Sequence, residues 1–159
     1  MAWGKNGTPD TLTGTADVLT ISDMTANTFL GVMCQTIPSG NANPTITLHN
    51  DTGSNSARRR SEEGGADATA VSQTEIDYGR DPTELIFTTS YMVNISSEEK
   101  LIIMNVVANN TNGAGNAPKR AEMVWKWVNT SSQITRIDVT NSQTGDFAID
   151  SNLSALGTD

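Results

Sequence analysis

The sequence predicts an all-β protein, a single antiparallel β-sandwich or jelly-roll-like domain of about eight to ten strands. Short runs of β-branched and aromatic residues are separated by turn residues roughly every 8 to 12 positions. No segment has the apolar period of a helix longer than about two turns. The 159 residues, of which 36% are apolar, suit one domain with a real core and are too few for two.

Residues 1–14 are predicted to form an N-terminal arm, and residues 15–159 form the sandwich. The arm is rich in Gly, Asn and Thr and shows little periodicity, so it should gain order only by packing on something. Trp3 stands out, because an exposed indole on a flexible arm is unfavourable. We expect Trp3 to anchor the arm in its own domain or in a neighbouring subunit.

Three segments of the first third alternate in polarity or are rich in apolar residues, and strands are expected over residues 16–22, 28–37 and 45–50. Pro38 and Gly40 end the second of these strands, because proline removes a ladder donor and glycine permits a positive φ. The third strand places Ile46 and Leu48 on one face and polar residues on the other. This alternation is typical of a strand that is half exposed to water.

Residues 56–80 are the least patterned quarter of the chain. We expect a long surface excursion there, with one or two short strands near residues 56–62 and 70–76. Gly64 and Gly65 lie at its centre. Long loops in compact domains often bind ligands, so these two glycines are candidate binding-loop residues.

The second half predicts longer strands over residues 84–95, 100–109, 119–128 and 134–140, followed by one or two short closing strands within residues 147–156. The first two should form a hairpin. Residues 110–118, NTNGAGNAP, form a flexible glycine-bearing loop. Within this loop, Asn112, Gly113 and Gly115 are candidate binding residues.

Alternation places Ala121, Met123, Trp125 and Trp127 on one face of the strand at 119–128. Exposed aromatic rows on a sandwich can stack on sugar rings. A row that continues into methionine and alanine instead favours the core or a subunit interface. These four residues are therefore candidate contacts with another chain.

The net charge of −8 and a pI near 4.5 predict that the chain repels polyanions, which argues against non-specific binding of nucleic acid. One basic run interrupts the acidic balance: Arg58, Arg59 and Arg60. Glu62 and Glu63 follow at once and cancel most of the local field. The run is expected to be a solvated surface patch or a subunit contact.

Several residues could support chemistry, but none forms a diagnostic pattern. Cys34 and His49 could be a nucleophile and a base, yet alternation predicts a buried structural thiol and a surface imidazole. The one cysteine excludes an internal disulfide and a cysteine-based zinc cluster. The acid pairs at 62–63 and 98–99 lie in turns, where neighbouring side chains diverge, unlike the facing carboxylates of glycosidases. We therefore expect no enzyme activity and no cofactor.

Asp146, Asp150 and Asn152 lie close together in GDFAIDSN, an oxygen-rich stretch similar to loops that hold calcium. The spacing differs from that of an EF-hand and lacks the closing glutamate, so no metal ligand is assigned and a cation near Asp146 and Asp150 stays open. The first residues show no secretory signal, and the longest apolar runs are far below the roughly 20 residues that span a bilayer. Synthesis in the cytoplasm without export, and no membrane partner, are expected.

A series of short strings lies in order along nearly the whole chain, and none of them is an internal repeat. They are PSG at 38–40, NDTG at 50–53, GGAD at 64–67, EEKL at 98–101, GAG at 113–115 with Pro118 and Arg120, KW at 126–127 with NTS at 129–131, QITRI at 133–137, TGD at 144–146 and LGTD at 156–159. Together they resemble a family of small virion-associated structural proteins encoded by marine tailed bacteriophages. The family offers no catalytic motif to carry over.

The resemblance implies a structural component of the virion, made in the host cytoplasm. Its partners would be other virion proteins and copies of itself, in trimers or larger rings that cover exposed edges and apolar faces. A capsid decoration (cement) protein, a neck or tail component and a fibre module all stay open. The alternative is a carbohydrate- or host-receptor-binding module of a phage appendage, which would bind through residues 56–80, residues 110–118 and Trp125 or Trp127.

Overall fold

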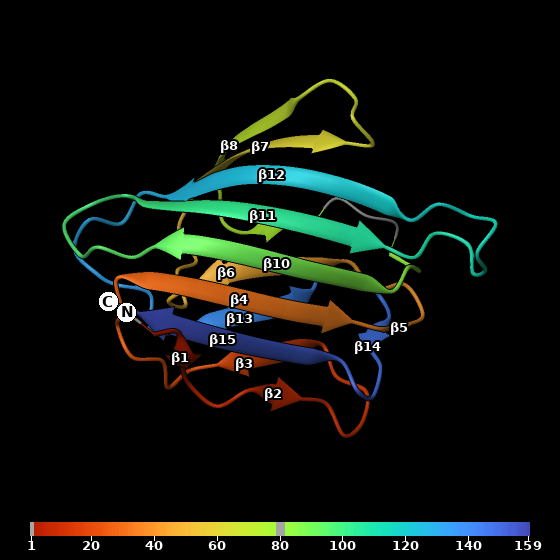
Figure 1. Cartoon of the computed structure of the whole chain (residues 1–159), viewed down its shortest axis with the longest axis horizontal. Helices are drawn as coiled ribbons and strands as arrows, with labels where there is room; N and C mark the ends of the chain where they lie inside the picture. Colours follow the sequence, from red (N-terminus) through yellow and green to blue (C-terminus); the bar gives the residue numbers. More distant parts are fainter. Residues whose placement is uncertain (1, 79–81) are drawn as a thin grey trace.

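The computed structural model describes residues 2–78 and 82–159, and over these residues the chain contains strands and no helix. The predicted all-β antiparallel sandwich is confirmed: a broad sheet lies in front of a smaller one in Figure 1. No membrane-spanning helix occurs in the described part of the chain. Residue 1 of the predicted arm and residues 79–80 of the predicted excursion lie outside the described residues.

The large sheet contains nine strands: β1 (Gly4–Lys5), β2 (Asp10–Thr11), β4 (Phe29–Thr36), β7 (Ser56–Glu62), β8 (Ala68–Gln73), β10 (Ile86–Val93), β11 (Lys100–Ala108), β12 (Lys119–Trp127) and β15 (Asn152–Thr158). They lie in the order β1-β15-β4-β10-β11-β12-β7-β8, and β2 pairs with the other end of β15. All pairs are antiparallel. Strand β15 therefore joins the first strands of the chain to β4.

The small sheet has the order β3-β13-β6-β9, with β3 (Val18–Ile21), β13 (Ile137–Asn141), β6 (Pro44–Leu48) and β9 (Ile76–Asp77). A further pair joins β5 (Pro38–Ser39) to β14 (Asp146–Phe147). Alternate residues of both sheets form one core, for example Ile102 and Met104 of β11 with Ile137 and Val139 of β13. The small sheet covers one face of the large sheet (Figure 1), which we call the inner face.

The N-terminal arm packs on its own domain. Strands β1 and β2 both pair with β15 of the same chain. The buried side chain of Asn6 donates to the carbonyl of Thr25 and accepts from its N–H, at 2.9 and 2.6 Å. The N–H and hydroxyl of Thr8 both donate to Asp23, and these bonds lower the pKa of that carboxyl. The sequence left open whether the arm packs on its own domain or on a neighbouring subunit, and these contacts are all with its own domain.

The nine predicted strand segments between residues 16 and 140 each overlap an observed strand. β13 begins later than predicted, at Ile137, because the buried amide of Asn94 binds the backbone of Ile134 on both sides. Its oxygen accepts the Ile134 N–H at 2.6 Å and its nitrogen donates to the Ile134 carbonyl at 3.2 Å. These bonds use the groups that a ladder partner would otherwise take.

The described part of the predicted excursion, residues 56–78, contains more strand than predicted. β7 and β8 form a hairpin that extends the large sheet, while β9 crosses to the small sheet. Few apolar residues mark these strands, since both faces of the hairpin are partly exposed. The segment therefore belongs to the sheet framework and not to a loose surface loop.

Candidate functional site

The four predicted contacts on β12 point into the chain's own core. Ala121, Met123, Trp125 and Trp127 are each at most 4% exposed, because β12 lies in the middle of the large sheet and the small sheet covers their face. The expectation that they touch another chain is wrong. A period of two identifies the apolar face of a strand, but it does not say whether the chain's own second sheet or another chain covers that face.

The opposite side of the large sheet, which we call the outer face, carries the exposed apolar residues. Among the described residues, ten large apolar side chains there, or at its margins, are between 38% and 70% exposed: Trp3, Phe29, Met33, Val71, Phe87, Tyr91, Leu101, Ile103, Val107 and Val124. Most lie on β4, β10, β11 and β12, the central strands of the sheet in Figure 1. Within residues 2–78 and 82–159, no other segment buries them.

Strand register makes the centre of the outer face continuous. Tyr91 of β10 lies opposite Ile103 of β11, and Ile103 lies opposite Val124 of β12. Opposed residues of antiparallel strands have their Cβ atoms about 5 Å apart, so these side chains contact one another across the sheet. The next row carries Leu101 and Phe29. A single apolar band therefore crosses four strands.

Trp3 extends this band beyond β10. Its indole lies over Gly31, where an added Cβ would stand 3.3 Å from the ring. It meets the Tyr91 ring edge to face, with 6.3 Å between centroids and an interplanar angle of 76°. A side chain at position 31 would push against the indole, so Gly31 permits the close approach of Trp3 to the sheet.

A shallow hollow of about 740 Å³ runs along the outer face, from Trp3 to the β7–β8 hairpin. Apolar side chains line most of it, with Tyr91 and Ile103 near its middle and Val71 at its far end. The polar residues that line it are Arg58, Arg59, Thr69 and Lys126. Such a surface suits apolar side chains better than a sugar, whose hydroxyl groups need hydrogen-bond partners.

Charged side chains on this side of the sheet are paired within the chain. Lys126 binds Glu99 at 2.7 Å, Arg59 binds Asp67 at 3.1 Å, and Arg120 binds Glu122. These three cations and three carboxylates balance, whereas the whole chain carries −8. The outer face is therefore apolar and close to neutral.

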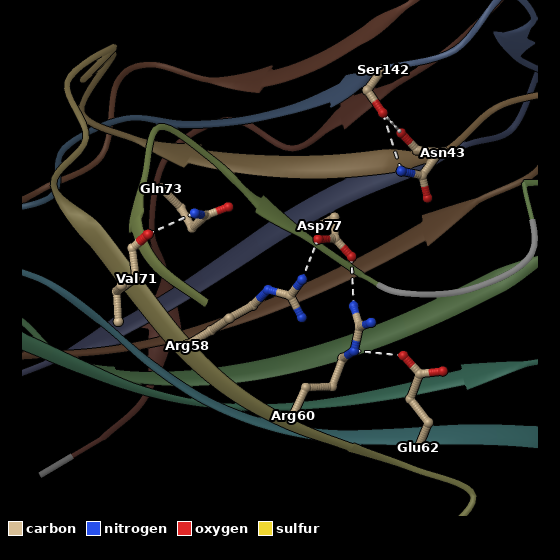
Figure 2. A network of polar contacts seen from close by, with 8 residues as sticks. All are labelled: Asn43, Arg58, Arg60, Glu62, Val71, Gln73, Asp77 and Ser142. Atoms are coloured by element: carbon tan, nitrogen blue, oxygen red, sulfur yellow. Dashed lines mark hydrogen bonds and ion pairs between the residues drawn. The ribbon is translucent and has the colours of Figure 1, made fainter. Parts of the chain in front are cut away.

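The predicted basic run is split between the two faces of β7. Arg59 faces out, while Arg58 and Arg60 turn inward and bind the two oxygens of Asp77 on β9, at 2.5 and 2.6 Å (Figure 2). Figure 2 also shows Glu62 beside Arg60, at 2.6 Å. Burial lowers the pKa of Arg58 and the Asp77 carboxylate opposes that shift. Arg58 and Arg60 thus hold the hairpin to the small sheet, and only Arg59 is placed to meet another molecule.

The two predicted binding loops are neighbours. Gly64 and Gly65 form the turn between β7 and β8, and Gly113 adopts φ 104° in the loop before β12. Backbone groups of Glu63 and Arg120 join the turn to the start of β12, and the Glu63 carboxylate accepts the Arg120 N–H at 2.6 Å.

The loop residues themselves are exposed, and their polar groups mostly bind each other. The Asn112 side chain accepts from Asn109 at 3.0 Å, and its carbonyl accepts from Asn116 at 3.1 Å. Gly113 and Gly115 have open space around them, since an added Cβ would meet no atom within 4 Å. Gly113 and Gly115 are therefore accessible, but no described side chain beside them is placed to bind a ligand.

The residues that could react or bind a metal lie in positions that do not favour such chemistry. Burial raises the pKa of the Cys34 thiol to about 12, so the thiol stays protonated at neutral pH and is a poor nucleophile. His49 lies at the surface, where its Nδ1 contacts the Thr135 hydroxyl at 3.3 Å. Among residues 2–78 and 82–159 no three His, Cys, Asp or Glu side chains gather closely enough to hold a metal, and this includes Asp146 and Asp150.

Comparison with known protein families and with curated protein sequences finds no match to this chain. Its outer face therefore has to be understood from its own chemistry. A signal for it was present in the sequence: the β11 stretch KLIIMNVVA is apolar at both odd and even positions. Strands of that kind are typically covered on both faces, and the chain itself covers only one.

Proposed function

We propose that this chain is a non-enzymatic structural protein of a bacteriophage virion, an oligomeric surface β-sandwich such as a capsid decoration protein or a neck, tail or fibre component. The observation that carries the proposal is the outer face, with its ten exposed large apolar side chains. Monomeric proteins rarely expose contiguous apolar patches above a few hundred Å², and larger ones mark interaction sites.

The rest of the molecule fits a role in assembly. The two sheets share one core, the arm is tied down by paired strands, and the basic hairpin is tied to the small sheet by Asp77. This framework presents the outer face rigidly. The ordered strings that resemble virion proteins of marine tailed phages support the assignment of this assembly role to a phage particle.

The test is the presence of the protein in purified particles of the phage that encodes it. Antibodies against the purified chain should label intact particles in immunogold electron microscopy. Mass spectrometry should find the chain in a fixed ratio to the major capsid protein. Absence from particles purified by density gradient would overturn the proposal.

A carbohydrate- or receptor-binding module is the second candidate. One observation favours it: Trp3 and Tyr91 are exposed aromatic rings on the same face. Trp125 and Trp127 cannot serve, because both are buried. Glycan-array binding that Tyr91→Ala abolishes would promote this candidate, whereas the scarcity of polar groups around the rings predicts no binding.

A further inference from the structure

We infer that the outer face of one chain packs against the outer face of a second copy, related by a two-fold axis. The inference rests on the proposed function in taking the outer face as an assembly surface. It goes further in naming the partner and the symmetry. Three properties of the outer face carry it: its residue pattern, its size and its charge.

The residue pattern is that of an interior sandwich face. On the three central strands the outward residues include Tyr91, Ile103 and Val124, in direct register with one another. Their inward neighbours, such as Ile102 and Met104, meet the small sheet in the same manner. Two β-sheets pack face to face about 10 Å apart with interdigitated side chains. A second large sheet on the outer face would repeat the packing that the small sheet makes on the inner face.

The size matches a specific interface. Ten large apolar side chains at 38–70% exposure present on the order of 800 Å² of apolar surface, which is the area that each partner buries in a standard protein interface. The hollow of about 740 Å³ between Trp3 and Val71 gives room for side chains of the facing copy. A short peptide would leave much of this surface exposed.

The near-neutral charge of the outer face favours a second copy of this chain over a strongly charged partner. Lys126, Arg59 and Arg120 already have carboxylate partners, so a polyanion finds little net attraction there. A basic partner likewise finds Glu99, Asp67 and Glu122 neutralised. Two copies can bring these neutral faces together although each chain carries −8. Acidic residues such as Asp17, Asp146 and Asp150 belong to segments around the small sheet and the β5–β14 pair.

Sedimentation velocity of the full chain over a range of concentrations tests the inference. We expect a dimer that dissociates on dilution. Ile103→Asp should raise the dissociation constant by more than about 30-fold, as for the loss of a central interface residue. The matched control is Ile149→Asp, because Ile149 is 54% exposed but lies off the outer face, in the segment between β14 and β15. The control should dimerise like the wild type.

Three results would overturn the inference. One is a wild-type chain that stays monomeric up to about 100 μM, the weak end of specific association. Another is an oligomer that Ile103→Asp leaves intact. The third is a trimer or ring, because those use head-to-tail contacts between two different surfaces. The second and third results leave the proposed function standing, whereas a monomer leaves a role in the virion standing but removes its oligomeric form. Absence from particles would leave the dimer standing.

Trp3 provides a second readout that needs no charged substitution. The other two tryptophans, Trp125 and Trp127, are buried, so acrylamide should quench mainly Trp3, and the Trp3→Phe variant gives the background. Quenching should decrease as the wild-type chain is concentrated. Quenching that stays constant while the chain is concentrated would contradict the inference even if Ile103→Asp failed to fold.

Discussion

Lys100 shows how a charged side chain can be built into the core side of a sheet. It is 0% exposed, and its ammonium group donates to the carbonyls of Ser96, Glu98 and Asn129 at 3.3, 2.8 and 2.6 Å. The ammonium also lies 5.7 Å from the centre of the Trp127 ring. Burial lowers the pKa of Lys100, and the nearby Glu98 opposes this. One cation thus joins the turn after β10 to the turn after β12.

Replacing Lys100 should destabilise the chain more than replacing a surface lysine. Lys100→Met leaves three carbonyl acceptors without their donor, which should lower the free energy of unfolding by about 2 kcal/mol. Lys126→Met is the control, because its pair with Glu99 is exposed and worth about 0.5 kcal/mol. Urea unfolding measures both. Equal losses would mean that the Lys100 hydrogen bonds add nothing beyond a surface ion pair.

Asp51 holds the indole of Trp127. Its Oδ2 accepts from Trp127 Nε1 at 2.6 Å and its Oδ1 accepts from the Gly53 N–H at 2.8 Å. Burial alone would raise the pKa of Asp51, but these bonds and those from Asn55 outweigh burial and lower the pKa below its ordinary 3.8. The folded chain therefore binds this proton less readily than the unfolded chain.

The stabilisation from Asp51 should be present above pH 4 and disappear as the pH falls through the folded-state pKa. Asp51→Asn should lower the free energy of unfolding by about 1 kcal/mol at neutral pH, and the gap to the wild type should close in acid. Unfolding followed by circular dichroism between pH 2 and 7 measures this. Asp150→Asn, at an exposed carboxyl, is the control; a gap for Asp51→Asn that stays constant with pH would contradict the assignment.

At the scale of elements, the β7–β8 hairpin depends on a cross-sheet tie. Strand β9 is two residues long, and its Asp77 binds two arginines of β7. The side chains of Arg58 and Arg60 are only 11% and 16% exposed, so their charges need this carboxylate. Without it the hairpin would be held to the sandwich mainly by the β7–β12 ladder.

Asp77→Asn should loosen the hairpin selectively. The substitution removes the negative charge that pairs with two partly buried guanidinium groups. This should lower the free energy of unfolding by about 2 kcal/mol and speed amide exchange in β7 and β8. Asp67→Asn is the matched control, since its pair with Arg59 is exposed on both sides and should cost about 0.5 kcal/mol or less. Hydrogen–deuterium exchange with mass spectrometry locates the effect. Unchanged exchange in β7 and β8 would argue against the tie.

Element positions could be predicted because alternation and turn residues are local signals. The short strands β1, β2, β5 and β9 could not, because two residues carry no period and pair only through distant partners. The candidate site was placed on the wrong side of β12. Alternation separated the apolar face of β12 from the side that carries Arg120, Glu122 and Lys126 around Val124. Only the position of the small sheet shows that the chain itself covers the apolar face.

At the scale of the whole molecule, association should depend little on salt. The ion pairs near the outer face join residues of the same chain, and the proposed interface is apolar. Screening by salt therefore removes little of the attraction between two chains. Salt also screens the repulsion between two chains of charge −8. The dissociation constant should therefore change by less than about threefold between 50 mM and 1 M NaCl, or decrease. A tenfold weakening in sedimentation experiments would indicate ion pairs across the interface.

The position of β15 has a consequence for the timing of folding. β15 lies between β1 and β4, so the edge of the large sheet forms only by joining residues more than a hundred positions apart. Such non-local pairing is slow, whereas the β10–β11–β12 meander needs only short loops and can form early. The small sheet that covers the inner face of the meander also needs distant segments, since β13 pairs with β3, and until it docks the meander carries unprotected apolar residues on both faces. Newly made chains are most prone to aggregate in this interval, so lower temperature and slower synthesis should favour soluble protein.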